Sequence, residues 1–227
     1  MKLLCMILDL LVKVDVTSNK ILKLCMYTIS KPLTYICNGS LNTGTFPERF
    51  KLAIMRPIHK KGDKNEINNY RPLSLLTTIS KILEIIMYKR LAQHFESNKF
   101  LTSAQFGFRK GFRIDDAVFF LLNRTIKLLD EQKHVGGIFC DLTRASDCVN
   151  HNILLHKLKY YGITGSSLSW FKSYLENRKQ KVCLSPNAQD QAASSKRKVV
   201  VNGVPQGSIL GPLLFIIYLN DLPYGLQ

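Results

Sequence analysis

Acidic residues are scarce in this 227-residue sequence: 16 Asp and Glu stand against 32 Lys and Arg, which gives a formal net charge of +16. The imbalance is concentrated in residues 51–113, which carry 13 basic and four acidic side chains. A protein this basic is attracted to polyanions, with nucleic acid as the first candidate and an anionic membrane surface as the second. We therefore expect one subregion of the chain to hold most of the basic surface.

Cysteine and histidine patterns typical of metal sites are also missing. The six cysteines form neither a Cys-x-x-Cys pair nor a regular framework, which argues against a zinc site and favours a reducing compartment over secretion. His151 and His156 are five residues apart and do not share a helix face. A histidine metal site is therefore not expected.

Long apolar runs are absent as well. The apolar stretch 209–219 has eleven residues, whereas a bilayer-spanning helix needs about twenty, so we interpret it as a buried helix. The N-terminal apolar run is interrupted by Asp9 and lacks a small-residue cleavage site, which indicates an amphipathic helix and not a signal peptide. Because 46% of the residues are hydrophobic, the chain can still bury a sizeable core in one or two domains.

The sequence is organised around residues 135–151, where a short apolar run ends at Asp141 and then turns polar. The length of the run and its glycines favour a strand buried on both faces, with Asp141 at the point where the strand emerges. A carboxylate there could bind a hard cation such as Mg²⁺ or cap the following helix. The stretch itself leaves both roles open, although Asp147 and Asn150 are better placed as caps.

Helical spacing of apolar residues predicts most of the remaining structure. Residues 1–40 are interpreted as two short helices separated at Pro32. Thr78 and Asp115 are each expected to cap a helix, the first with an apolar face that belongs to the core. Two more helices are predicted after residue 150, and the first of them should close at Gly162.

Two β-hairpins are predicted. Residues 52–58 and 69–76 read as strands joined by a loop rich in Lys, Gly and Asn, whose tip is cationic. This loop is either a solvated surface or a phosphate grip, because lysines supply point charges and Arg71 supplies a bidentate fork for phosphate oxygens. Residues 179–184 and 197–201 flank a polar loop and form the second hairpin.

Two glycine-containing turns are candidate ligand-binding elements. Residues 105–111 combine two aromatic, two glycine and two basic residues, a weak signal for a turn where a polyanion approaches the backbone closely. Residues 203–208 follow a predicted strand and precede the apolar helix. They therefore present Gln206 and bare backbone to a ligand.

Together these segments resemble the reverse transcriptases of non-LTR retrotransposons, the jockey-like elements especially. The resemblance covers roughly residues 30–227 and is carried by motifs at 46–47, 59–63, 69–72, 105–109, 141–147 and 203–212. It implies an α+β, right-hand polymerase fold with fingers and a partial palm, in which an antiparallel palm sheet packs on helices. It divides the chain into a helical adaptor (1–40), a fingers-like region with the basic hairpin (41–134) and a partial palm (135–227).

The resemblance also implies roles for individual residues. Asp141 matches the first catalytic, metal-binding aspartate. The residues implied to bind the incoming deoxynucleoside triphosphate are Lys60, Lys61, Arg71, Ser146, Gln206 and Gly207. Contacts to nucleic acid are expected at Lys64, Arg109 and Lys110. Ser146 stands where the family has an aromatic ring under the sugar, so weaker selection of deoxynucleotides is expected.

The implied activity is RNA-directed DNA polymerisation, with Mg²⁺ or Mn²⁺, an RNA template and a DNA primer, inside the cell and without a membrane. Two divalent cations need several carboxylate ligands, and the family's second acidic cluster is not found in these 227 residues. The chain alone is therefore expected to be inactive, with metal binding only in the complete domain. The alternatives are a nucleic-acid-binding remnant without catalysis and a basic membrane-surface protein.

Overall fold

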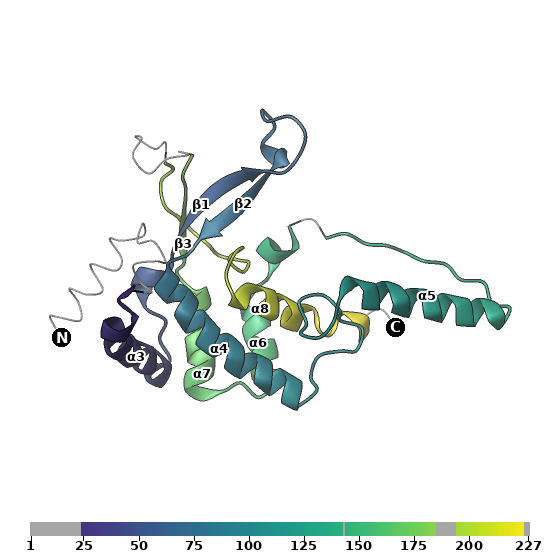
Figure 1. Ribbon diagram of the computed structural model, residues 1–227, viewed down its shortest axis with the longest axis horizontal. Helices are drawn as coiled ribbons and strands as arrows, with labels where there is room; N and C mark the ends of the chain where they lie inside the picture. The colour runs from purple at the N-terminus through teal and green to yellow at the C-terminus, as the bar shows by residue number, and fades with distance from the viewer. Residues whose placement is uncertain (1–23, 143, 185–193, 225–227) are drawn as a thin grey trace.

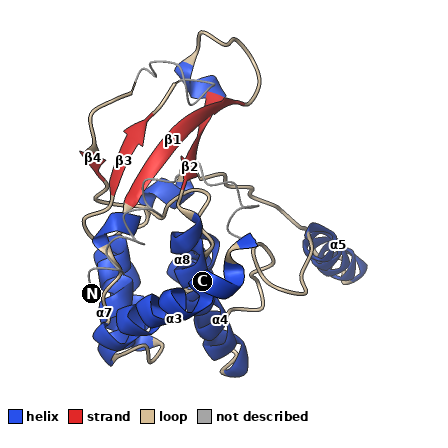
Figure 2. Cartoon of the chain, turned by 60° about the vertical axis from the view of Figure 1, so that its left-hand side comes forward, coloured by secondary structure: helices blue, strands red, loops and turns tan. Residues whose placement is uncertain are grey.

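The computed structural model describes residues 24–142, 144–184 and 194–224. In this part of the chain a small β-sheet lies on one side of a layer of helices, and a further helix, α5 (Ile114–Asp130), extends away from both (Figure 1 and Figure 2). The helices of the layer are α3 (Met26–Thr43), α4 (Thr78–Ser97), α6 (His151–Tyr160), α7 (Gly165–Leu175) and α8 (Leu210–Leu219). Among the helices described, none has the length and apolar character needed to cross a membrane.

The sheet has four strands in the order β2-β1-β3-β4. Both predicted hairpins are confirmed: β1 (Leu52–His59) pairs antiparallel with β2 (Tyr70–Leu75), and β3 (Lys179–Val182) with β4 (Lys198–Val199). The sheet as a whole is mixed and not purely antiparallel, because β1 and β3 pair in parallel, whereas β3 and β4, both within residues 135–227, pair antiparallel. Parallel pairing is open to these strands since the long helical crossover between them lets the chain return in the same direction.

Residues 135–141 do not form the predicted strand. The segment is extended but makes no strand ladder with any described segment, and Ile138 and Phe139 are 93% and 87% exposed. A strand of this composition is stable when neighbours bond its backbone and cover both of its faces. No described segment does so, and residues 131–142 run as an uncovered connection from the end of α5 (Figure 1).

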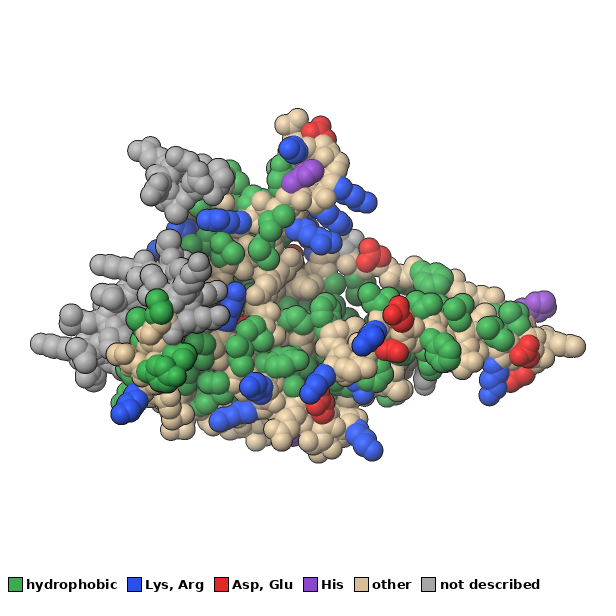
Figure 3. Space-filling view, in the orientation of Figure 1, with side chains coloured by type: hydrophobic (Ala, Val, Ile, Leu, Met, Phe, Trp, Pro, Cys, Tyr) green, Lys and Arg blue, Asp and Glu red, His purple; other side chains and the backbone are tan. Residues whose placement is uncertain are grey.

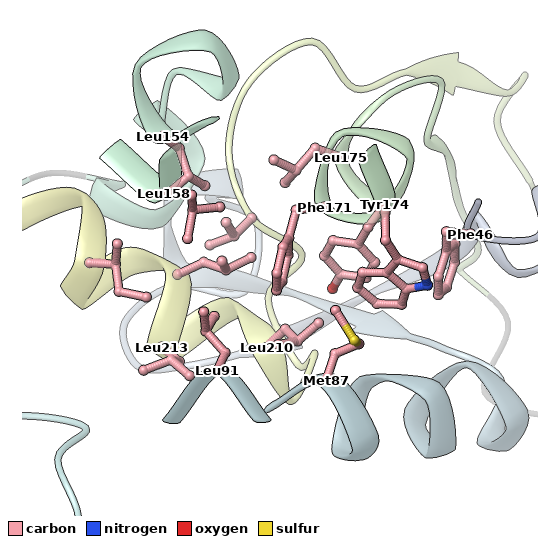
Figure 4. Packing of buried hydrophobic residues seen from close by; sticks show 14 of the residues in the cluster. Phe46, Met87, Leu91, Leu154, Leu158, Phe171, Tyr174, Leu175, Leu210 and Leu213 are labelled. Atoms are coloured by element: carbon pink, nitrogen blue, oxygen red, sulfur yellow. The ribbon is translucent and has the colours of Figure 1, made fainter. Parts of the chain in front are cut away.

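The core lies between the helices of the layer (Figure 4). Trp170 and Tyr174 of α7 stack with ring centroids 5.5 Å apart, and Phe46 meets both rings edge-on. The predicted apolar face of α4 is confirmed, since it contributes buried or partly buried side chains at Ile79, Ile82, Leu83, Ile86 and Phe95. Edge-to-face and offset contacts of this kind stabilise a core beyond the area that they bury.

Two predicted helix caps differ from those in the structure. The cap of α4 is Thr77, not Thr78: its extended backbone lets the hydroxyl accept the N–H of the third helical residue at 3.2 Å. In α5 the N-cap position is Arg113, not Asp115, and the carboxylate of Asp116 in the first turn accepts the Arg113 N–H at 2.6 Å. A side chain caps a helix only where it can reach a backbone N–H that has no intrahelical partner. Neighbouring residues of the same type look equivalent in the sequence, but in the folded chain they do not reach the same N–H.

The N-terminal helices also differ from the prediction. Pro32 lies inside α3, beyond its first turn, and does not divide it: the proline cannot donate an intrahelical hydrogen bond, but the helix continues to Thr43 and packs against α7. The expected amphipathic helix at the N-terminus lies outside the described residues. The cap of α6 is confirmed at Asn150, and the helix closes as predicted with Gly162 at a φ of 85°.

Candidate functional site

The turn formed by residues 203–208, here called the Gln206 turn, is held between two parts of the chain that are distant in sequence. On one side the Val204 N–H donates to the Ser146 carbonyl oxygen at 2.9 Å. On the other side the Ser74 N–H of β2 donates to the Gln206 carbonyl oxygen at 3.1 Å. The turn therefore joins the segment after Asp141 to the strand that carries Arg71.

The two glycines of the Gln206 turn allow this close fit. Gly203 and Gly207 have φ values of 89° and 99°, which favour glycine. A Cβ at Gly203 would lie 2.8 Å from the Asp147 Cα, and one at Gly207 would lie 2.9 Å from the Ser74 carbonyl oxygen. Any side chain at either position would push the turn away from its neighbours.

Two cavities border the Gln206 turn. The first, of about 300 Å³, is bounded by the turn, by the start of α8 and by side chains that include Phe108, Arg144 and Ser146. The second, of about 210 Å³, lies against the sheet and is lined by Met55, Ser74 and Gln180 among others. Gln206 borders both, and its side-chain amide donates to the Asp147 carboxylate at 2.9 Å.

The predicted phosphate-binding residues lie on the β1–β2 hairpin. Lys60, Lys61 and Lys64 are exposed in the loop and Arg71 is exposed on β2, in a region where basic side chains gather (Figure 3). No ion pair found among the described residues engages any of the four. Their positive charges are therefore available to an anionic ligand.

The structure brings the sheet and the Gln206 turn together at Leu73. A Cβ built on Gly207 would lie 3.5 Å from the Leu73 Cδ1 atom. Because side chains two apart on a strand share a face, Arg71 projects from the same face of β2 as Leu73. Ser146, Gln206 and Gly207 thus border one cavity. Arg71 lies two residues from Leu73, toward the end of β2 that adjoins the loop with the three lysines.

The Arg109 side chain contacts residues of its own loop. Its Nη1 donates to the Thr102 carbonyl oxygen at 3.0 Å, and its guanidinium lies 4.3 Å from the centroid of the Phe112 ring. Lys110 beside it is exposed. Within residues 105–111 it is Phe108, and neither basic residue, that borders the larger cavity.

Asp141 is exposed at the end of the extended segment. In the described parts of the chain no three His, Cys, Asp or Glu side chains lie close enough together to hold a metal ion. Divalent cations such as Mg²⁺ require several oxygen ligands. The residues described do not by themselves fit such a cation.

Comparison with known proteins identifies the chain's family. Residues 58–227 match the family described as "Reverse transcriptase (RNA-dependent DNA polymerase)". The chain belongs to this family. The match covers the loop and the second strand of the basic hairpin, Asp141 and the Gln206 turn, and it confirms the predicted resemblance.

Relatives of this reverse transcriptase domain come from transposable elements of Drosophila melanogaster. "Probable RNA-directed DNA polymerase from transposon BS" is 35% identical over 198 residues, covering 84% of this chain and 20% of that protein. "Probable RNA-directed DNA polymerase from transposon X-element" is 33% identical over 216 residues, and "RNA-directed DNA polymerase from mobile element jockey" is 31% identical over 210 residues. Each of these two matches covers 92% of this chain and 22% of the relative. The chain thus spans about a fifth of the length of these curated relatives.

One residue of the reverse transcriptase domain that sequence reasoning missed is Glu84, which is fully buried in α4. Its Oε2 accepts the N–H groups of Ile209 and Leu210 at 2.7 and 3.3 Å, and its Oε1 accepts the Ser80 hydroxyl at 3.2 Å. Burial raises the pKa of the Glu84 carboxyl, although these donors and the Arg178 guanidinium favour its ionised form. The sequence signal that points to Glu84 is a single acidic residue within an apolar helical run.

Proposed function

We propose that this reverse transcriptase domain forms the fingers and part of the palm of an RNA-directed DNA polymerase of a non-LTR mobile element. In this proposal residues 1–40 are a helical adaptor, residues 41–134 the fingers-like region and residues 135–227 the partial palm. The observation that carries it is the Gln206 turn, which unites β2 and the segment after Asp141 beside a cavity of about 300 Å³. In this proposal the template and the nucleotide bind where β2 and the segment after Asp141 meet.

The incoming deoxynucleoside triphosphate is proposed to bind in this cavity. Ser146, Gln206 and Gly207 line it and would contact the sugar and base. Arg71, on the face of β2 that reaches the turn, would hold phosphate oxygens as a bidentate donor. Lys60 and Lys61 would add positive charge when the flexible hairpin tip folds over the triphosphate, which stabilises the charge that develops on the phosphates during transfer.

Asp141 is proposed as the first metal-binding carboxylate. A bound Mg²⁺ or Mn²⁺ would neutralise the triphosphate and lower the pKa of the attacking hydroxyl. Further oxygen ligands would have to come from residues other than those described, so we expect metal binding of the complete domain. Lys64, Arg109 and Lys110 are proposed to contact the backbone of the RNA template or DNA primer, Arg109 through the guanidinium N–H groups that do not bond the Thr102 oxygen.

A second candidate function is nucleic-acid binding without catalysis. It is favoured by one observation, the absence of any metal-binding cluster among the residues that the structure describes. The exposed cations of the hairpin are sufficient for binding by electrostatic attraction to phosphates.

Primer extension on an RNA template, with Mg²⁺ or Mn²⁺, separates the two functions. The proteins compared are the 227-residue chain, the chain extended with the segment that follows this region in the jockey relative, and Asp141→Asn in both. We expect extension by the longer form alone and its loss in Asp141→Asn. Binding of template without extension by either form would support the second function, and Asp141-dependent extension by the 227-residue chain would overturn its expected inactivity.

A further inference from the structure

We propose that Glu84 is a positioning residue: it fixes the Gln206 turn by holding the first backbone N–H groups of α8. The inference rests on the proposed function, because the turn is part of the proposed nucleotide site. The residue before α8, Ile209, provides no side-chain cap of its own. The cap comes instead from Glu84, which lies 125 residues earlier and on a different helix.

The first turn of α8 is tied rigidly to the Gln206 turn. The Ser208 hydroxyl donates to the Pro205 carbonyl oxygen at 2.7 Å and accepts the Gly211 N–H at 3.0 Å. A Cβ at Gly211 would lie 2.6 Å from the Ser208 Oγ and 3.1 Å from the Pro205 oxygen, so the two segments are in close contact. A shift of the α8 start would therefore move Pro205 and, with it, the adjacent Gln206.

A carboxylate suits this position for two reasons. The N-terminus of a helix carries partial positive charge, and an ionised acceptor forms stronger hydrogen bonds with backbone N–H groups than a neutral one. Burial raises the pKa of the Glu84 carboxyl, and the nearby Arg178 guanidinium and the Ser80 hydroxyl, which donates to it, partly offset this cost of the charge. Its burial means that water does not compete for either N–H group.

The other end of α8 is held by the opposite charge. Lys157 of α6 donates through Nζ to the Tyr218 carbonyl oxygen and to the Asp221 carboxylate, both at 2.5 Å. A cation at the C-terminus and an anion at the N-terminus both complement the helix dipole. These bonds of Lys157 are made at the end of α8 remote from the Gln206 turn, so their removal weakens the same helix without releasing the turn.

Hydrogen exchange measured by mass spectrometry tests the proposal on the 227-residue chain without nucleotide or metal. Glu84→Ala should accelerate exchange in peptides covering residues 203–210 by about tenfold or more, while α7 remains protected. Glu84→Gln, which keeps an oxygen acceptor, should restore most of the protection. Lys157→Met should lower the melting temperature but leave residues 203–210 protected, and Glu96→Ala, an exposed carboxylate on the same helix, should change neither.

Two results would overturn the positioning role: unchanged exchange in residues 203–210 of Glu84→Ala, or an equal acceleration there in Lys157→Met. If Glu84→Ala loses protection throughout the chain, Glu84→Asp decides. Its shorter side chain keeps the charge but withdraws the oxygens from Ile209 and Leu210, so residues 203–210 must exchange faster while α7 stays protected. Unchanged exchange in Glu84→Asp would refute the proposal. Because no polymerase activity is measured, a chain that fails to extend primers can still pass this test.

Discussion

Gln206 and Asp147, 59 residues apart in the sequence, are joined side chain to side chain, with the Gln206 Nε2 atom 2.9 Å from the Asp147 Oδ1 atom. The bond sets the direction of the Gln206 amide on the wall between the two cavities. It also engages one oxygen of the acid that lies six residues after Asp141. The segment that carries Ser146 and Asp147 therefore helps to orient the Gln206 turn.

The first prediction is that Gln206 and Asp147 are energetically coupled. Because the bond has a charged acceptor and is partly exposed, we expect a coupling free energy of about 0.5–1.5 kcal/mol. It is measured by urea unfolding of Asp147→Ala, Gln206→Ala and the double variant. Additive effects would show that the contact contributes nothing to stability and that the amide is free to turn.

The second prediction concerns RNA binding by the basic hairpin. Lys60→Gln with Lys61→Gln should weaken RNA binding and flatten the slope of log K against log salt by about 0.7–0.9 for each phosphate that the variant no longer binds. Fluorescence anisotropy over a salt series measures both. Lys89→Gln with Lys159→Gln removes the same charge from exposed sites on α4 and α6 and is the control. Equal effects of both pairs would mean that net charge, and not the hairpin, drives binding.

The third prediction concerns Ser146, which lines the larger cavity and leaves it open. Introducing a ring by Ser146→Phe should raise discrimination against ribonucleotides in a form of the domain extended to activity, because the ring would occupy the space needed by a 2′-hydroxyl. Single-nucleotide incorporation with paired deoxy and ribo substrates gives the ratio. Ser146→Ala, which adds no bulk, should leave it unchanged. A ratio unaffected by Ser146→Phe would assign the position to packing.

The fourth prediction is a pH dependence that originates at Glu84. Burial raises its pKa above the ordinary value of 4.5, so the folded state keeps the proton to a higher pH than the unfolded state does. The contribution of Glu84 to stability is therefore largest at and below pH 4.5 and is lost as the pH rises toward the folded pKa, with a slope of at most about 1.4 kcal/mol per pH unit.

Urea unfolding at several pH values checks this sign. The free energy of unfolding of the native chain minus that of Glu84→Gln should fall as the pH rises through that window, since the glutamine does not titrate. Glu96→Gln, at an exposed site of the same helix, is the control. A difference that increases with pH would mean that the Ile209 and Leu210 N–H groups outweigh the cost of burial.

The fifth prediction is that the uncovered segment promotes self-association. Ile138 and Phe139 are almost fully exposed, and apolar side chains of α5 are exposed as well, at Val118, Phe119, Leu122, Ile126 and Leu129. Figure 3 shows hydrophobic side chains on the surface of the projecting α5. Exposed apolar surface of this extent favours association. Ile138→Lys with Phe139→Lys should shift sedimentation velocity profiles toward the monomer. Tyr160→Lys with Tyr224→Lys adds the same charge at exposed aromatic sites elsewhere, and an equal shift there would attribute the effect to charge alone.

Several features of the domain follow from local sequence. The β1–β2 hairpin, the cap of α6 at Asn150 and its end at Gly162 were all predicted, because alternation, capping and positive φ involve residues close together in the chain. The basic tip at Lys60 and Lys61 was predicted for the same reason. The exposed turn at Gln206 and Gly207 could be recognised from its glycines, since they signal an unusual backbone wherever they occur.

Tertiary structure alone decided the remaining features, because each depends on a partner distant in the sequence. Strand β1 joins β3 in parallel across the 119 residues between them, which no local pattern specifies. Residues 135–141 have strand-like composition, yet no segment that the structure describes bonds their backbone, and they stay extended and exposed. In the sequence, Glu84 is an acid within an apolar helix. In the folded chain it accepts two N–H groups at the start of α8. Composition determined which residues could be buried or charged, and tertiary packing determined which of them contact one another.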